Sequence, residues 1–303
     1  MDIIFAGSPS SSAEILSKLV KSSFNVSLVL TQGDKRSARN KPEEPSEVAK
    51  LAESESLPCI KIDSFCDETV NKINKYPCDI LVLSSFGKII PQEILQYPSI
   101  TPLNIHFSIL PLYRGASPIQ SALLNGDNKT GISFMEMVES LDEGPVFDAF
   151  EVEISYSDNR ISLEKKLVTK AVNSIVDVLH RVSNGLQPVP QGDDGVSYCK
   201  KISKEDGRIN FSDTAVEILN KYRAFSGWPG TFFEFKDINI KVHGMHVIEA
   251  DSDDIPGSII DVKKDGIYVR AVDSVIVITH IQLPGKKIIN SADIHNSYKD
   301  FFV

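Results

Sequence analysis

Residues 103–119 read LNIHFSILPLYRGASPI, and this stretch decides how the first half of the chain folds. It opens as a β-rich run in which Asn104, His106 and Ser108 alternate with apolar residues. Alternate side chains of a strand share a face, so the three polar groups point the same way. A strand covered by helices on both sides normally carries apolar side chains on both faces. The polar triplet is therefore either a ligand-facing strand end or a hydrogen-bonded core group, and the spacing alone leaves both interpretations open.

Strand and helix patterns alternate around this stretch, over the first 150 residues. The expected strands are 3–6, 26–31, 59–62, 80–83, 103–107 and 132–138. The expected helices are 11–20, 46–55, 67–75 and 118–124. Strands spaced by one helix length predict right-handed crossovers and a mainly parallel sheet covered on both faces. Such sheets bind ligands at the carboxyl ends of their strands.

The pattern changes after a long amphipathic helix at 163–182, which Asn184 and Gly185 end. Residues 187–195, QPVPQGDDG, have the composition of a linker. Beyond a helix at 214–224, the expected strands are 231–235, 238–243, 258–262, 267–271 and 275–283. Short strands without intervening helices favour a small barrel or sandwich.

Composition excludes several classes of protein. A chain of 303 residues with 42% hydrophobic content predicts two domains with their own cores, not a disordered or fibrous chain. The net charge of -9 argues against a protein that coats nucleic acid. That charge is uneven, because 18 basic and 26 acidic residues precede Lys200, whereas 14 basic and 15 acidic residues follow from it onward. Any nucleic-acid contact is thus expected in a few basic patches.

Cysteine spacing and the N-terminus bear on the compartment. Cys59, Cys66, Cys78 and Cys199 form no C-x-x-C pair, and in a chain of this length they are typical of reduced thiols. The apolar run at 3–6 is too short for a signal peptide, and no run of 18 apolar residues occurs. We expect a soluble cytoplasmic protein with no membrane partner, no disulfide framework and no metal site.

Gly7 closes the first expected strand and is followed by Ser8 and Pro9. This is either a ligand-binding turn or an ordinary strand-to-helix turn. Because Gly7 is the only glycine of the turn, a dinucleotide site of the G-x-G-x-x-G type is improbable.

A second polar loop follows the strand at 132–138 and reads ESLDEGP, residues 139–145. It would emerge beside His106 if that strand runs parallel to the one carrying His106. Asp142 could then fix the imidazole tautomer, although a solvated turn residue is the alternative. An amide, an imidazole and a carboxylate together suit acyl transfer to an amine. No nucleophile turn such as G-x-S-x-G is present, which favours direct transfer without a covalent intermediate.

Three motifs resemble the folate-dependent formyltransferases: NIHFSILPLYRGASPI at 104–119, SSFGKIIP at 84–91 and SLDEGP at 140–145. Three others resemble the branch of that family that acts on methionyl-tRNA: IIFAGSP at 3–9, TQGDKR at 31–36 and AFSGWPGTFF at 224–233. The resemblance implies an α/β fold, with a Rossmann-like parallel-sheet formyltransferase domain at 1–186, a linker at 187–204 and an oligonucleotide-binding-like C-terminal β-barrel at 205–303. It implies 10-formyltetrahydrofolate as donor, tetrahydrofolate as product and methionyl initiator tRNA as acceptor, in translation initiation by a monomer.

The resemblance also assigns roles to residues. The implied catalytic residues are Asn104, His106 and Asp142. The implied folate contacts are Phe86, Gly87, Lys88, Ile89, Ile90, Ser108, Ile109, Leu110, Pro111, Val138, Glu139, Ser140, Leu141 and Glu143. Backbone groups of such loops can recognise the donors and acceptors along a pterin edge.

The implied tRNA contacts form two basic clusters, which are Lys35, Arg36, Arg39 and Lys41, then Lys200, Lys201, Lys204 and Arg208. The first cluster lies in the loop with which the family probes the end of the acceptor stem. Arg39 is expected to exploit the weak terminal pair of initiator tRNA. Glu43, Glu44 and Glu47 follow this loop, whereas the family usually has more basic residues there.

The roles of two residues and the function itself have alternatives that the sequence leaves open. Arg114 either positions an acceptor phosphate or carboxylate, or starts a helix and pairs with a nearby acid. Trp228 is expected to pack at a helix end and not to stack on a base. A formyltransferase acting on another amine, an amino sugar or a glycinamide nucleotide, is the second function. An RNA-binding protein on an inactive scaffold is the third, and retention of Asn104, His106 and Asp142 weighs against it.

Overall fold

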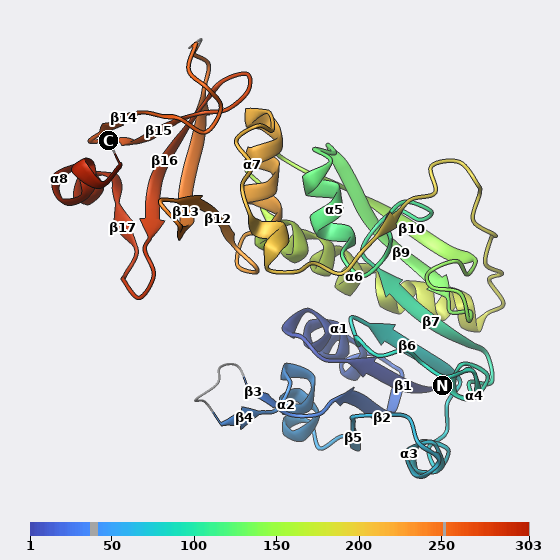
Figure 1. Cartoon of the computed structure of the whole chain (residues 1–303). Coiled ribbons are helices and arrows are strands. Elements are labelled where there is room, and N and C mark those ends of the chain that lie inside the picture. Colours follow the sequence, from blue (N-terminus) through green and yellow to red (C-terminus); the bar gives the residue numbers. More distant parts are fainter. Residues whose placement is uncertain (37–41, 251–252, 303) are drawn as a thin grey trace. The chain divides into compact units, whose positions relative to one another are not determined.

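A seven-stranded sheet organises the first half of the protein. The computed structural model describes residues 1–36, 42–250 and 253–302. Within that part the strand order is β10-β9-β7-β6-β1-β2-β5 (Figure 1). These strands are β1 (Asp2–Gly7), β2 (Asn25–Gln32), β5 (Cys59–Ile62), β6 (Ile80–Ser84), β7 (Thr101–His106), β9 (Lys129–Glu136) and β10 (Val146–Glu153). From β5 to β7 all neighbours pair in parallel, and the order reverses between β1 and β6, where open α/β sheets place their ligands.

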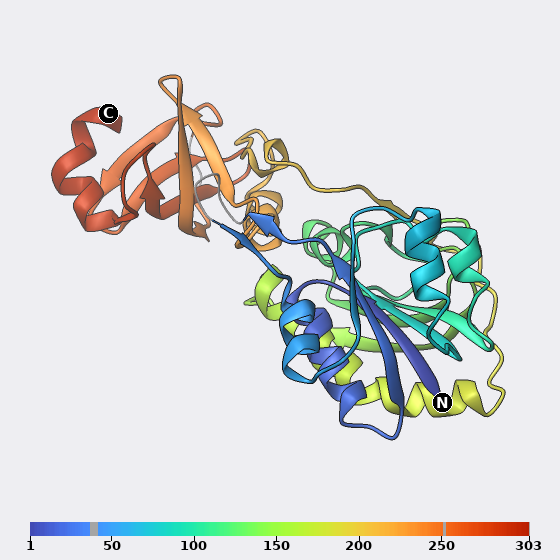
Figure 2. The ribbon, with the colours of Figure 1, turned by 90° about the horizontal axis from the view of Figure 1, so that it is seen from below.

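Helices cover both faces of this sheet. They are α1 (Ser10–Val20), α2 (Glu47–Ser54), α3 (Asp67–Ile73), α4 (Gln92–Leu95) and α6 (Arg160–Ser183). Figures 1 and 2 show α1 and α6 along one face, with α3 and α4 on the other. All six residues of β7 are buried as a result. The predicted mainly parallel α/β domain is confirmed.

The direction of the last two strands corrects one expectation. β9 pairs with β7 antiparallel, with His106 opposite Ser133, so the condition of a parallel strand leading to Asp142 is wrong. β10 continues the antiparallel edge. An antiparallel edge on a parallel sheet is common, and an apolar run carries no signal of strand direction. Asp142 still reaches His106 because the loop between β9 and β10 folds back toward the end of β7.

Two short two-stranded ladders are separate from this sheet. β8 (Arg114–Gly115) pairs in parallel with β11 (Tyr198–Cys199). β3 (Lys35–Arg36) pairs antiparallel with β4 (Glu43–Glu44), which sets each basic position opposite an acidic one. Residues 187–199, expected within a linker, therefore end in a strand that packs on the first half of the chain.

The C-terminal part forms an antiparallel sheet in the order β12-β13-β16-β15-β14, with β17 beside β16. Its elements are η1 (Glu205–Gly207), α7 (Ala215–Ala224), β12 (Thr231–Phe235), β13 (Ile238–Ile248), β14 (Ile259–Lys263), β15 (Gly266–Arg270), β16 (Val275–Gln282), β17 (Ile289–Asn290) and α8 (Ser291–Phe302). α7 begins at a capping box between Thr214 and Glu217, which satisfies the first free amides of the helix. Ile240, Ile267 and Ile276 are fully buried in its core. The predicted run of short strands without intervening helices is confirmed and forms an antiparallel sheet.

The chain divides into two compact units. The first comprises Met1–Pro118, Lys129–Glu153 and Glu164–Cys199, and the second comprises Ile119–Asn128, Ile154–Leu163 and Lys200–Val303. The second unit thus includes most of α5 (Pro118–Leu124) and the first turn of α6. Within this unit, Arg223 of α7 links the 154–163 segment to the C-terminal part by donating to the carbonyl oxygens of Ser155 and Asp158.

Candidate active site

Asn104, His106 and Asp142 come together at the carboxyl end of β7. Nδ2 of Asn104 donates to Oδ1 of Asp142 over 3.4 Å. Nδ1 of His106 lies 3.5 Å from Oδ2 of the same carboxylate. The His106 and Asp142 side chains are only 6% and 10% exposed, so water screens their interaction weakly. The three predicted side chains thus form one buried cluster.

The hydrogen bonds of His106 define its tautomer. Nε2 lies 2.9 Å from the carbonyl oxygen of Tyr113. A carbonyl oxygen only accepts, so Nε2 carries the proton of the neutral ring. Nδ1 is then the basic nitrogen, and it faces the Asp142 carboxylate. A proton taken up at Nδ1 would therefore lie between the imidazole and a negative charge.

Burial sets the protonation state of this ring. The pKa of His106 lies below its ordinary value of 6.5, because desolvation of the imidazolium outweighs the stabilisation that Asp142 and the Tyr113 carbonyl give it. The neutral ring is consequently the main form at pH 7. A buried neutral imidazole beside a carboxylate is suited to accept a proton.

The loop that carries Asp142 is held in an unusual conformation. Asp142 has a φ of +55°, in the left-handed region that favours glycine. The amide of Gly115 donates to Oδ2 of Asp142 over 2.8 Å and fixes the carboxylate from the side of β8. Sequence patterns missed this contact, because Gly115 lies outside any periodic element.

Arg114 lies in β8 and starts no helix. Its guanidinium donates to the Tyr198 hydroxyl over 3.1 Å and lies 3.5 Å from Oε1 of Glu143. The Tyr198 hydroxyl donates to the same carboxylate over 2.6 Å. Of the two roles considered for Arg114, pairing with a nearby acid is the one observed. A further partner, Gln191, was also missed, since its Pro- and Gly-rich surroundings are typical of a linker.

The loop after β6 contains the first group of implied folate contacts. Phe86 is fully buried in the core, and its carbonyl oxygen accepts a hydrogen bond from Nε2 of Gln32. Gly87 adopts a φ of +71°, Lys88 donates from Nζ to a backbone carbonyl, and Ile90 packs partly against the core. Ile89 is 93% exposed, an unusual position for a large apolar side chain.

The loop after β7 contains the second group. Ser108 is buried and its hydroxyl donates to the Leu112 carbonyl over 2.5 Å. The Leu110 amide donates to a serine hydroxyl of β9, while Ile109 and Pro111 are partly buried. These internal bonds fix the loop, and they occupy the Leu110 amide that a ligand would otherwise use.

The loop before and after Asp142 contains the third group, Val138, Glu139, Ser140, Leu141 and Glu143, all of them exposed. Val138 is 41% and Leu141 66% exposed. Apolar side chains exposed on this loop and the loop after β6 match the mainly apolar lining of small-ligand sites. The residues present therefore fit a flat, partly apolar ligand such as a pterin.

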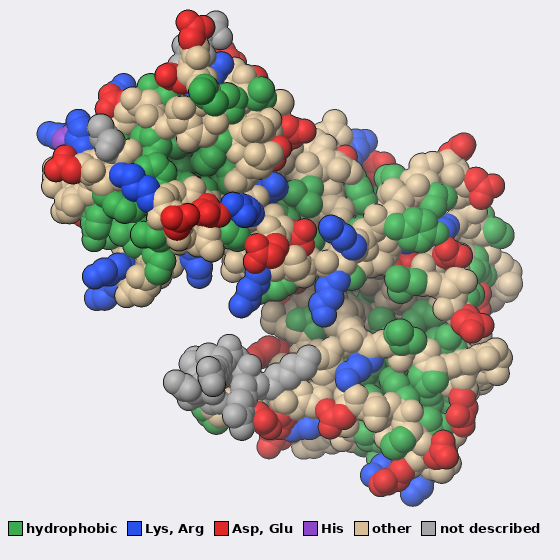
Figure 3. Space-filling view, viewed as in Figure 1, with side chains coloured by type: hydrophobic (Ala, Val, Ile, Leu, Met, Phe, Trp, Pro, Cys, Tyr) green, Lys and Arg blue, Asp and Glu red, His purple; other side chains and the backbone are tan. Residues whose placement is uncertain are grey.

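The basic residues implied for tRNA are spread over both units. Lys35 and Arg36 form β3, whereas Arg39 and Lys41 lie outside the described residues. On the face shown in Figure 3, Lys and Arg side chains lie interspersed with Asp and Glu and form no single block.

The second basic cluster belongs to the C-terminal unit. Lys200 lies 3.7 Å from the Asp206 carboxylate, and Arg208 pairs with Glu234. Lys201 and Lys204 are exposed.

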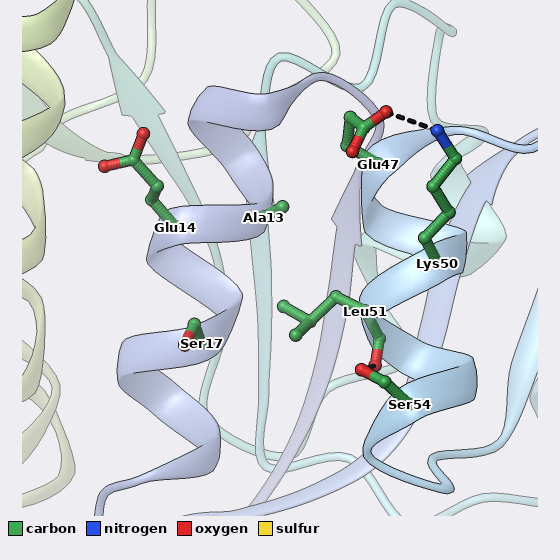
Figure 4. A pocket seen from close by; sticks show the side chains of 7 residues that line it. All are labelled: Ala13, Glu14, Ser17, Glu47, Lys50, Leu51 and Ser54. Atoms are coloured by element: carbon green, nitrogen blue, oxygen red, sulfur yellow. Dashed lines mark hydrogen bonds and ion pairs between the residues drawn. The ribbon is translucent and has the colours of Figure 1, made fainter.

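A separate surface pocket lies between α1 and α2 (Figure 4). It is lined by Ala13, Glu14, Ser17, Glu47, Lys50, Leu51 and Ser54. Glu47 and Lys50 form an ion pair on α2. None of these residues belongs to the predicted site.

Neither a metal site nor a membrane-spanning helix is found in the part of the chain that the structure describes. Residues 1–36, 42–250 and 253–302 contain no group of three His, Cys, Asp or Glu side chains able to hold a metal ion. In the same ranges, no helix is both long and apolar enough to cross a membrane. All four cysteines are free thiols.

Fold and site together define a class: an α/β enzyme with an amide, an imidazole and a carboxylate clustered for acyl transfer to an amine. Comparison with known proteins agrees. A model of the formyl transferase family matches residues 1–179, and a model of the formyl transferase C-terminal domain matches residues 201–299. The chain belongs to the formyl transferase family, and the resemblance read from its motifs is confirmed. It is a formyl-transferring enzyme.

Curated relatives are similar over their full length. A methionyl-tRNA formyltransferase of a Sulfurihydrogenibium species is 36% identical over 306 residues, covering 99% of this chain and 97% of that protein. The enzyme of the same name from Caldicellulosiruptor saccharolyticus is 36% identical over 304 residues, with the same coverage.

Solved structures support the fold. An N-formyltransferase from Helicobacter canadensis, in complex with folinic acid and dTDP-3-aminofucose, has a TM-score of 0.67 at 16% identity, covering 91% of this chain and 98% of that one. Methionyl-tRNA formyltransferase from Clostridium thermocellum has a TM-score of 0.59 at 19% identity, covering 81% and 93%. At these identities the likeness concerns the fold alone.

Proposed function

We propose that the protein transfers the formyl group of 10-formyltetrahydrofolate to the α-amino group of methionine on initiator tRNA and releases tetrahydrofolate. One observation carries the chemistry: Asn104 and His106 are buried, the first within hydrogen-bond distance and the second within ion-pair distance of the Asp142 carboxylate. The 36% identity to methionyl-tRNA formyltransferases over nearly the whole chain supports this acceptor.

In the proposed reaction the neutral amine attacks the formyl carbon, and a new carbon–nitrogen bond replaces the bond to the folate. The Asn104 amide donates to the developing oxyanion. Nδ1 of His106 accepts the proton that the amine loses and relays it to the folate nitrogen as that nitrogen leaves, and Asp142 stabilises the transient imidazolium. Proton transfer of this kind contributes roughly 10² to 10⁴ in rate.

The formyl donor is proposed to lie against the loops at 86–90, 108–111 and 138–143. Exposed Ile89 and Leu141 offer apolar surface, and nearby backbone groups offer donors and acceptors. Folinic acid, the folate in the Helicobacter canadensis complex, shows that the fold accepts a folate in a neighbour. The 10-formyl form is proposed because the resemblance to the folate-dependent formyltransferases implies it as the donor.

For the tRNA, we propose phosphate contacts by Lys200, Lys201, Lys204 and Arg208, and acceptor-stem contacts by the basic residues at 35–41. Arg39→Ala is expected to reduce the use of methionyl-tRNA by about tenfold or more, and to leave folate binding unchanged. Steady-state kinetics with initiator tRNA and a folate titration check this. Equal losses in both would indicate a folding defect and not a lost contact.

We also propose that residues 1–186 form the catalytic domain, 187–204 the linker and 205–303 the tRNA-binding β-barrel domain, and that the enzyme works as a monomer in the cytoplasm. Free thiols in all four cysteines are compatible with a reducing compartment. Sedimentation at working concentration tests the monomer.

A panel of acceptors tests the function. Purified protein receives labelled 10-formyltetrahydrofolate with charged initiator tRNA, charged elongator methionyl-tRNA, or an amino sugar nucleotide. Transfer to initiator methionyl-tRNA supports the proposal. Transfer to the small amine alone would favour the second function, and tRNA binding without transfer to any acceptor would favour an inactive scaffold.

A further inference from the structure

The side chain of Gln191 commits every hydrogen-bonding group it has to the active-site loops. Its Nε2 donates to the carbonyl oxygen of Asp142 over 2.8 Å and to that of Gly144 over 2.7 Å. Its Oε1 accepts from Nε and Nη2 of Arg114 over 3.0 and 2.8 Å. A primary amide has two N–H donors and two acceptor positions, so the set is complete.

These bonds hold the backbone of a loop whose side chains are held by other contacts, such as those of Gly115 with Asp142 and of Tyr198 with Glu143. Asp142 has a φ of +55°, and its neighbours Ser140 and Leu141 are exposed and add no core packing. Its carboxylate is fixed only if its backbone is fixed, because a shift of the backbone moves Oδ2 away from Nδ1 of His106. The side-chain amide of Gln191 fixes this backbone at the carbonyl oxygens of Asp142 and Gly144.

The carbonyl oxygen of the Gln191 side chain bonds the segment that carries Arg114 and Gly115. Arg114 is 8% exposed, and its guanidinium presents two parallel N–H groups to Oε1 of Gln191. Gly115, the next residue, donates its amide to Oδ2 of Asp142. Gln191 and Gly115 therefore connect the same two segments, one through the backbone of Asp142 and the other through its carboxylate.

Gln191 is itself anchored on both sides. Two residues earlier, the amide and carbonyl of Val189 pair with those of Val146, each over 2.8 Å. Further on, the Ser197 carbonyl accepts from the Arg114 amide over 2.9 Å, and the Ser197 hydroxyl accepts from the Tyr113 amide over 2.9 Å. We call residues 189–199 the strap. An amide on an anchored strap is a fixed reference for the loop.

We propose that Gln191 is a positioning residue for formyl transfer, which holds the Asp142 carboxylate against His106 by clamping the 142–144 backbone to Arg114. The inference rests on the proposed function, since it gives Asp142 its role. Gln191 touches no reacting atom and acts through Asp142. Its loss is expected to lower turnover and to leave the binding of both substrates nearly unchanged.

The first test compares two methionine variants, because methionine keeps the length of glutamine and removes its hydrogen bonds. Gln191→Met is expected to lower kcat for formyl transfer by about 10- to 100-fold. The KM for initiator methionyl-tRNA and the Kd for the folate should stay within about twofold. Gln187→Met is the matched control: Gln187 lies in the same segment, is exposed and makes one bond, to the Gly185 carbonyl. Unchanged kcat in Gln191→Met would overturn the proposal.

The second test needs no activity. The Gly115 amide reports on the Asp142 carboxylate, whereas the Arg114 amide reports on the strap. In Gln191→Met, hydrogen exchange at Gly115 should accelerate by about tenfold or more, with exchange at Arg114 unchanged. Equal acceleration at both amides would mean general loosening, and no change at Gly115 would mean that Gln191 does not hold the loop. Either result contradicts the proposal.

The two readouts separate two kinds of failure. Wild-type protein that transfers no formyl group to methionyl-tRNA would refute the proposed function, and the exchange data would still decide whether Gln191 holds Asp142.

A glutamate variant adds a third comparison. Gln191→Glu keeps an acceptor for Arg114 and loses both donors, so it should be as slow as Gln191→Met. Wild-type turnover in Gln191→Glu would show that the bonds to the 142–144 backbone are not needed.

Discussion

The carbonyl of Tyr113 decides which nitrogen of His106 is basic. It accepts the Nε2 proton, so Nδ1 is the basic nitrogen, and Nδ1 faces the Asp142 carboxylate. Desolvation keeps the ring neutral, and the carboxylate then stabilises the charge that appears during transfer. In the proposed mechanism, burial favours the neutral ring before transfer, and the negative charge of Asp142 stabilises the imidazolium during transfer.

The pH dependence of turnover follows from this balance. Because the pKa of His106 lies below 6.5, the acidic limb of kcat/KM should lie below pH 6.5. Asp142→Asn removes the charge that raises this pKa, so the limb should move to still lower pH while the rate at the plateau falls. Rate profiles between about pH 5 and 8 measure both effects. A limb above 6.5, or an upward shift in Asp142→Asn, would contradict the assignment.

At this scale the sequence predicted the members of the cluster but not what fixes them. Alternation in 103–107 places Asn104 and His106 on one face of a strand, and β7 has that form. The approach of Asp142 was inferred from a parallel strand that is in fact antiparallel. The contacts of Gln191 left no sequence signal, because a polar residue among prolines and glycines is typical of a linker.

Among the elements, the short ladder between β8 and β11 borders the site through Gly115. Gly115 makes it feasible: its φ is +118°, and a Cβ there would lie 2.3 Å from the carbonyl oxygen of Cys199. No side chain fits that space without moving one strand from the other. The ladder and the Asp142 carboxylate therefore depend on one glycine.

Gly115→Ala should displace β11 and weaken the bond from the 115 amide to Asp142. We expect turnover to fall by about tenfold or more, together with a lower Tm, because the backbone conformation is strained as well. Gly192→Ala is the control, since Gly192 has open space around it and an ordinary φ. Kinetics and thermal unfolding of the two variants check this. Equal behaviour of both would show that the ladder has no special role.

The β3–β4 ladder pairs basic positions with acidic ones. Its register sets Lys35 opposite Glu44 and Arg36 opposite Glu43. The acids that depart from the family's usual composition thus occupy the facing strand of a hairpin. A sequence shows the order of the charges, whereas strand pairing decides which of them face each other.

For the whole molecule, the net charge of -9 is misleading as a guide to partners. Most of the excess acid precedes Lys200, and some basic residues of the C-terminal unit are already engaged, such as Arg208 with Glu234. If tRNA contact is confined to a few basic patches, as proposed, each cation in them should matter. This uneven distribution of charge can be read from the sequence.

The division into compact units cannot be read in the same way, because each unit is discontinuous in sequence. The segment 154–163 belongs to the second compact unit and is bonded to Arg223, a long-range packing that no local pattern reveals.

Replacing both Lys201 and Lys204 by alanine should weaken tRNA binding at low salt and reduce the slope of log K against log salt by about 2. Folate binding should not change. The control, Lys50→Ala with Lys72→Ala, removes the same charge from surface ion pairs on α2 and α3. Binding titrations at several salt concentrations measure the slopes. Identical slopes for the two double variants would mean that bulk charge, not local contact, governs binding.

The most direct measurement of the central claim is the rate of formyl transfer by His106→Ala beside wild type, at saturating 10-formyltetrahydrofolate and initiator methionyl-tRNA. We predict a loss of about 10² to 10⁴ in kcat, with the Kd for the folate within about twofold of wild type. A His106→Ala variant that binds the folate normally and keeps more than about half of the wild-type rate would contradict the assignment of His106 as the group that accepts the proton.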